Sequence, residues 1–145
     1  MKIFILLLFV AILPSCTTYI IPKLSLVEQL GSIDSTQLVN RQVIGPIATH
    51  YEYLANPIAE IKCEDKYGQQ NILTNSPSIE IRVTESSGKK TIFYFDRILI
   101  VNNQLLGVRS RFASFVDKTI DLENIQLIEV QDGKKNFKYS NNYSQ

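Results

Sequence analysis

The sequence predicts a mainly β fold, either a small antiparallel barrel or a sandwich, with one short helix near the N-terminus. Apolar and polar residues alternate strictly over 79–83, which is the period of a half-buried strand. Residues that favour turns separate the apolar runs at short intervals, as at 86–88 and 102–103. Helical spacing of apolar residues is clear at Leu24, Val27 and Leu30 alone.

The first 15 residues have the parts of an export signal. Lys2 precedes an uninterrupted apolar run from Ile3 to Leu13, and a small residue, Ser15, follows Pro14. As a helix this run of residues would be roughly 17 Å long, too short for a bilayer core of about 30 Å. We therefore expect residues 1–15 to be a cleaved signal peptide.

The segment Leu13-Pro14-Ser15-Cys16 resembles the lipobox of bacterial lipoproteins. The resemblance implies cleavage between Ser15 and Cys16, a diacylglycerol on the Cys16 thiol and an acyl chain on its new amino group. No other cofactor is expected. Thr17 takes the position after Cys16, at which an Asp would retain a lipoprotein in the inner membrane. The resemblance therefore implies a lipid-anchored protein of the cell envelope, at the outer membrane. The alternative is an ordinary signal followed by a chance Cys.

The chain after residue 15 has no net charge. Of the 15 basic and 14 acidic residues of the full sequence, only Lys2 lies in the signal. A neutral domain lacks the basic surface of a nucleic-acid-binding protein, so no nucleic-acid partner is expected. It also lacks a polybasic contact with membranes, which leaves Cys16 as the predicted link to the lipid bilayer.

The elements follow in order along the mature chain. Residues 16–22 are predicted to be a lipidated tether, and 23–48 a helix and linker region in which Ser25 and Glu28 fit a capping box. Leu38-Val39 and Val43-Ile44 are candidate strands before a break at Gly45-Pro46. The β-domain is expected over 49–139, and residues 140–145 are predicted to be a flexible tail.

The second half of the β-domain has a specific order. A strand at 79–83 precedes a long bent strand at 91–101, an Asn102-Asn103 turn, a returning strand from Leu105, and two short strands joined by a helical turn at 123–125. This order over 79–131 resembles SH3-like and Sm-like small barrels. With the lipobox, the segments 92–96 and 128–133 resemble small bacterial lipoproteins that carry a compact β-domain, a resemblance that implies no activity.

Four charged residues form a candidate polar patch: Asp96, Arg97, Arg109 and Arg111. Asp96 interrupts an apolar run, and a two-residue turn at 102–103 would place it opposite Arg109. One interpretation is a cross-strand ion pair worth under about 1 kcal/mol. The other is a patch that binds an anionic ligand, such as a glycan or lipid headgroup, through arginine.

Motifs for catalysis or metal binding are lacking. The single His, His50, and the one cysteine other than Cys16, Cys63, could in principle pair, but alternation predicts a buried Cys63 on the same face as Ile61. No spacing of His and Cys residues predicts a metal site.

We therefore expect a non-enzymatic binding, scaffolding or assembly role with an envelope protein partner of unknown identity. Two alternatives stay open: a small envelope enzyme acting on glycan or peptide substrates, and a periplasmic ligand carrier or inhibitor.

Overall fold

The computed structural model describes residues 17–111 and 116–140. The predicted signal peptide, the predicted lipid attachment residue Cys16 and residues 141–145 of the predicted tail lie outside these residues. The described chain is mainly β, with antiparallel sheets and one short α-helix, as predicted.

The described residues contain twelve strands, one α-helix and four short 3-10 helices. The strands are β1 Thr18–Ile20, β2 Val39–Ile44, β3 His50–Ala55, β4 Glu60–Glu64, β5 Gln70–Thr74, β6 Ile79–Glu85, β7 Lys90–Tyr94, β8 Ile98–Val101, β9 Gln104–Gly107, β10 Lys118–Asp121, β11 Ile125–Asp132 and β12 Lys138–Tyr139. The helices are α1 Lys23–Leu30, η1 Ser35–Gln37, η2 Pro46–Ala48, η3 Phe95–Arg97 and η4 Leu122–Asn124.

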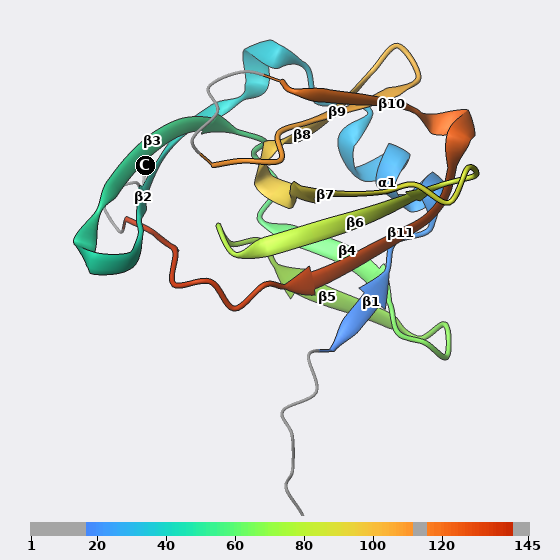
Figure 1. The fold of residues 1–145 in the computed structure, drawn as a ribbon, viewed down its shortest axis with the longest axis horizontal. Coiled ribbons are helices and arrows are strands. Elements are labelled where there is room, and N and C mark those ends of the chain that lie inside the picture. Colours follow the sequence, from blue (N-terminus) through green and yellow to red (C-terminus); the bar gives the residue numbers. More distant parts are fainter. Residues whose placement is uncertain (1–16, 112–115, 141–145) are drawn as a thin grey trace, which may run out of the picture.

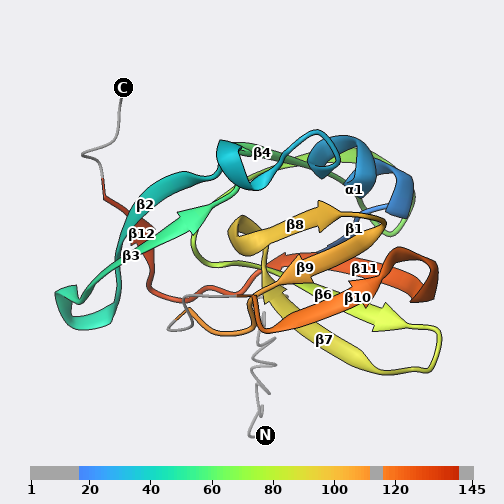
Figure 2. The same ribbon diagram turned by 90° about the horizontal axis from the view of Figure 1, so that it is seen from above.

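The strands form three antiparallel sheets. A six-stranded sheet has the order β5-β4-β1-β11-β6-β7, and a three-stranded sheet, β10-β9-β8, lies over it (Figure 2). A second three-stranded sheet, β12-β2-β3, extends to one side of these two layers (Figure 1). The six-stranded sheet ends in β5 and β7, so in the described part of the chain the sandwich form of the prediction is the one observed.

The main core lies between the six-stranded sheet, β8-β9-β10 and α1. Its largest fully buried side chains include Phe93 and Phe95, and α1 contributes Leu26 and Leu30. Burying such a side chain contributes about 1.5–3 kcal/mol. A separate small cluster of Val43, Tyr53 and Ala55 holds the side sheet together.

The order predicted for residues 79–131 is confirmed. The long run at 91–101 bends at η3, so that β7 belongs to the six-stranded sheet and β8 to the sheet above it. The Asn102-Asn103 turn has positive φ at both residues, 50° and 62°, as a tight hairpin turn requires. The predicted helical turn between the last two strands is η4.

The N-terminal region differs from the prediction in two ways. Residues 18–20, expected in the tether, form β1, which lies between β4 and β11 inside the six-stranded sheet. Three residues are too few to show a period, and only their β-branched and aromatic character favours a strand. The predicted capping box is also wrong, because α1 begins after Pro22, and Ser25 lies inside the helix. Pro22 occupies the N-cap position, with a φ of −55° and an extended ψ of 138°, and it has no backbone N–H that would need a partner.

Gly107 serves a close contact between the layers. It pairs in regular register with Ile98 on one side and Lys118 on the other. A Cβ atom at this position would lie 2.5 Å from Cδ1 of the buried Phe93 ring. The position therefore requires glycine because of space, not because of backbone conformation.

We expect Gly107→Ala to lower the free energy of unfolding by about 1–3 kcal/mol, the cost of overpacking a core. Urea denaturation of the variant measures this loss. Phe93→Leu makes room for the methyl group, so the double variant should lose less stability than the two single variants add up to. Strict additivity would contradict the proposed clash.

Candidate functional site

The bend η3 carries the candidate site. It places Asp96, whose side chain is fully buried, between the sandwich and the side sheet. Asn56, also buried, holds the bend in place: its backbone N–H donates to the Asp96 carbonyl at 2.7 Å, and its side-chain amide donates to the carbonyls of Phe95 and Ile98 at 2.7 and 3.2 Å. The position of the Asp96 side chain is thus fixed by backbone contacts.

The Asp96 carboxylate binds two tyrosine hydroxyls from the side sheet. Its Oδ2 atom accepts hydrogen bonds from Tyr53 on β3 at 2.5 Å and from Tyr139 on β12 at 2.9 Å. Burial, and the nearby Asp96 charge, raise the pKa of both tyrosines, so both hydroxyls stay protonated and donate. Asp96 therefore links the sandwich to two strands of the side sheet.

Arg111 completes this cluster from the segment after β9. Its side chain is 1 % exposed, and its Nη1 atom lies 3.8 Å from Asp96 Oδ2. The same Nη1 donates to the Tyr53 hydroxyl at 2.7 Å, so that Tyr53 accepts from the arginine and donates to the carboxylate. The guanidinium also stacks on the Tyr94 ring, 3.7 Å from its centroid. We call Tyr53, Asp96, Arg111 and Tyr139 the Asp96 cluster.

Several polar atoms of the Asp96 cluster have no hydrogen-bond partner within the described residues. They are Asp96 Oδ1 and the Nε and Nη2 atoms of Arg111. Burial raises the pKa of Asp96, while Arg111 and the two tyrosine hydroxyls act in the opposite direction. A buried ion pair with incomplete hydrogen bonding is costly to form and costlier to break.

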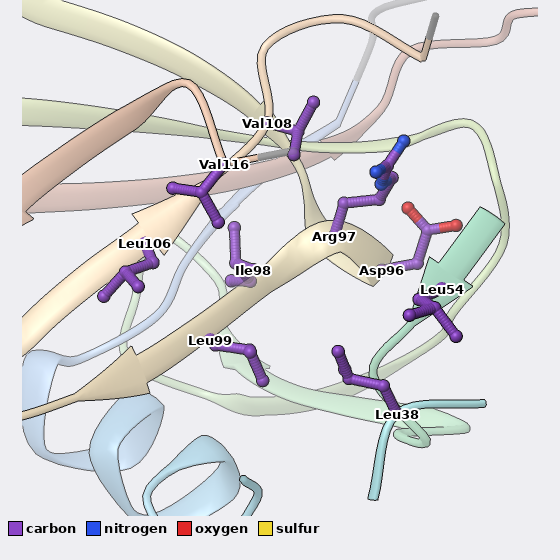
Figure 3. A pocket seen from close by; sticks show the side chains of 9 residues that line it. All are labelled: Leu38, Leu54, Asp96, Arg97, Ile98, Leu99, Leu106, Val108 and Val116. Atoms are coloured by element: carbon purple, nitrogen blue, oxygen red, sulfur yellow. The ribbon is translucent and has the colours of Figure 1, made fainter. Parts of the chain in front are cut away.

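A cavity of about 120 Å³ lies on the other side of η3. Asp96 and Arg97 line one end of it, and Figure 3 shows aliphatic side chains around the rest. These aliphatic residues are Leu38, Leu54, Ile98, Leu99, Leu106, Val108 and Val116. The guanidinium of Arg97 is half-buried, with its Cζ atom 4.7 Å from the Tyr53 ring centroid. The cavity is thus apolar, with two charged residues at one end.

Three of the four predicted polar residues come together, but not as a surface patch. Asp96 and Arg111 are enclosed, and Arg97 is half-buried beside them. The predicted pairing of Asp96 with Arg109 is wrong. β8 and β9 pair in the expected register, with Val101 opposite Gln104 and Ile98 opposite Gly107. Asp96, however, lies in η3, before the first paired residue of β8. Arg109 instead donates to Asp117 at 3.1 Å on the surface.

Sequence reasoning missed Tyr53, Tyr139 and Asn56 as parts of the site. Tyr51 and Tyr53 alternate along the sequence of β3, but alternation does not identify the residue that the Tyr53 hydroxyl binds. Tyr139 lies 43 residues after Asp96, and no local pattern joins them. Asn56 followed by Pro57 reads as a loop, and only its burial marks it as structural.

The other candidate residues lie apart from one another. Cys63 is buried in β4, as predicted, and burial raises the pKa of its thiol. His50 is exposed at the start of β3, in a different sheet. Among residues 17–111 and 116–140 there is no group of His, Cys, Asp and Glu side chains that could hold a metal ion. No helix in those two ranges is long and apolar enough to cross a membrane.

The two arginines near the end of β9 should differ sharply in their effect on stability. We expect Arg111→Gln to lower the free energy of unfolding by about 3–5 kcal/mol, because it removes the enclosed cation that is paired with the buried Asp96 carboxylate. The matched control Arg109→Gln breaks an exposed pair and should cost under about 1 kcal/mol. Thermal and urea denaturation measure both losses, and equal losses would contradict the assignment.

The loss caused by Arg111→Gln should depend on pH. Arg111 lowers the pKa of Asp96 against burial, so its removal raises that pKa further above the ordinary value. The folded variant then binds the proton more tightly than the unfolded chain, and its stability rises as the pH falls towards about 4. Urea denaturation at neutral and acidic pH should therefore show the difference from the wild type shrinking on acidification; a constant difference would argue against a charged Asp96.

Comparisons with known proteins identify no relative of this chain. No family model matches it, and no curated protein and no solved structure matches it. The assignment of a role therefore depends on the residues and the geometry described above.

Proposed function

We propose that this protein is a lipid-anchored component of the cell envelope with a non-enzymatic binding or assembly role. The observation that carries the proposal is the position of the lipobox cysteine. Cys16 precedes Thr17 and the first strand residue, Thr18, directly in the sequence. A diacylglycerol on its thiol and an acyl chain on its amino group together provide the several chains that stable anchoring needs.

The outer membrane is the proposed location. Thr17 occupies the position after the modified cysteine. By the sorting rule of lipoproteins, an Asp at this position would retain the protein in the inner membrane. The absence of an Asp there supports transfer to the outer membrane.

A binding role agrees with the two edges of the six-stranded sheet. β5 and β7 each have a neighbour on one side only within the sheet. Each also carries an exposed isoleucine, Ile72 on β5 and Ile92 on β7. An edge strand can accept an extended segment of another protein through backbone hydrogen bonds. By contrast, Asp96 and Arg111 are enclosed and occupied in structural contacts, which favours binding over catalysis.

Metabolic labelling with radioactive palmitate tests the anchor. We expect the full-length protein, produced in a bacterial host, to incorporate label and to sediment with membranes. Cys16→Ala should abolish both properties, because no other residue of the lipobox supplies a thiol. Cys63→Ala is the matched control and should keep the label; equal labelling of wild type and Cys16→Ala would overturn the proposal.

The cavity beside η3 favours a second candidate function, the binding of a small amphipathic ligand. Its volume of about 120 Å³ is somewhat smaller than that of an engineered apolar cavity of about 150 Å³ that binds benzene. The half-buried Arg97 at one end favours a carboxylate on a short aliphatic chain.

A thermal-shift titration with short-chain fatty acids tests this second function. Binding raises the melting temperature in proportion to the logarithm of ligand concentration above the dissociation constant. We expect butyrate or pentanoate to stabilise the protein more than the matching alkyl amines, and Arg97→Gln to remove the difference. Equal shifts with acids and amines would exclude a role for Arg97 in ligand selection.

A further inference from the structure

The start of β1 lies two residues after Cys16, so a lipid on Cys16 would be attached close to this end of the six-stranded sheet. β1 is an interior strand, and its first residue, Thr18, pairs with Gln131 of β11. Consecutive Cα atoms are about 3.8 Å apart, so the Cα atom of Cys16 lies within about 8 Å of the Thr18 Cα atom. A lipid attached to Cys16 therefore holds this end of the six-stranded sheet close to the bilayer.

The turn between β4 and β5 lies beside the start of β1. Ile20 of β1 pairs with Glu64, the last residue of β4, in antiparallel register. Thr17, Thr18 and Tyr19 line a depression of about 440 Å³ together with residues 65–67 of this turn and Asn71. Figure 1 shows the start of β1 and the β4–β5 turn on the same side of the molecule.

The β4–β5 turn is held rigidly by its own backbone. The Asp65 carboxylate accepts hydrogen bonds from the backbone N–H groups of Tyr67 and Gln69 at 2.8 and 2.9 Å. The Asp65 N–H donates to the Gln69 carbonyl at 2.9 Å, and Gly68 has a φ of 79°, which suits glycine. None of these contacts uses the Tyr67 side chain, so the turn fixes the backbone that carries Tyr67 and leaves its side chain available for other contacts.

The exposed side chains of the turn suit a membrane interface. Tyr67 is 76 % exposed, and the Lys66 amine lies 4.9 Å from the centroid of its ring. A tyrosine ring has an apolar body and a polar tip, and lysine carries a charge on an apolar stem, which is why both residues occur at the level of lipid headgroups. The negative charge of Asp65 is already bound by two backbone amides.

We propose that the β4–β5 turn rests in the headgroup region of the bilayer, with Tyr67 inserted beside the lipid on Cys16. This inference rests on the proposed lipid anchor, and it adds the orientation of the domain. The anchor and the turn make two contacts with the membrane from neighbouring strands, which restrict the tilt of the six-stranded sheet. The tip of the β2–β3 hairpin, where Ile47 is 97 % exposed, lies on the other side of the molecule from the β4–β5 turn (Figure 1).

The absence of tryptophan from the sequence permits a direct test. Tyr67→Trp introduces a single indole in the turn, and Ile47→Trp introduces one at the distal hairpin as the matched control. Both side chains are exposed, so neither substitution disturbs the core. Each full-length variant is purified from a bacterial host and reconstituted into vesicles of phosphatidylethanolamine and phosphatidylglycerol, with and without lipids brominated near the headgroup.

We expect brominated lipids to quench the indole of Tyr67→Trp strongly and that of Ile47→Trp little. The emission of Tyr67→Trp should also shift to shorter wavelength on reconstitution, because its indole leaves water. Adding Cys16→Ser to Tyr67→Trp should abolish the quenching, because one tyrosine-sized contact without the anchor binds weakly. Palmitate incorporation is measured on the same samples. Label at Cys16 with equal quenching at the two positions would overturn the orientation alone, whereas absence of label would overturn the anchor and the orientation with it.

Discussion

The contact between the Asp96 carboxylate and the hydroxyls of Tyr53 and Tyr139 joins the parts of this structure. The sandwich supplies Asp96 through the bend η3, and the side sheet supplies both tyrosines. The small cluster of the side sheet buries few residues, so its apolar contacts alone are a weak attachment. A buried charge with several donors fixes one relative position of the two parts, because other positions leave the carboxylate unpaired.

The same bend, η3, shapes both the Asp96 cluster and the apolar cavity. The bend turns the chain from the six-stranded sheet into the sheet above. It brings Asp96 to Tyr53 and Tyr139, and it places Ile98 and Leu99 in the lining of the apolar cavity. Asn56 holds this bend through three backbone contacts. Asn56 thus determines the geometry of both the Asp96 cluster and the cavity through the bend that it holds.

The proposed membrane attachment and the folding of the six-stranded sheet share one element, β1. β1 is the first strand after the lipobox and an interior strand of the largest sheet. The proposed anchor therefore acts directly on a strand that is held on both sides by neighbouring strands, β4 and β11. Such an attachment suits a protein that presents one surface to the membrane and the opposite surface to a partner.

The sequence by itself determined the strands with clear alternation, the Asn102-Asn103 turn and the helical turn between β10 and β11, since these depend on local periodicity and backbone preference. It also indicated Asp96 as an unusual charge in an apolar run. Only the tertiary structure decided that Asp96 meets Arg111 and not Arg109, that Tyr53 and Tyr139 bind it, and that residues 18–20 are a strand. These features depend on contacts between residues far apart in the chain, which no local pattern encodes.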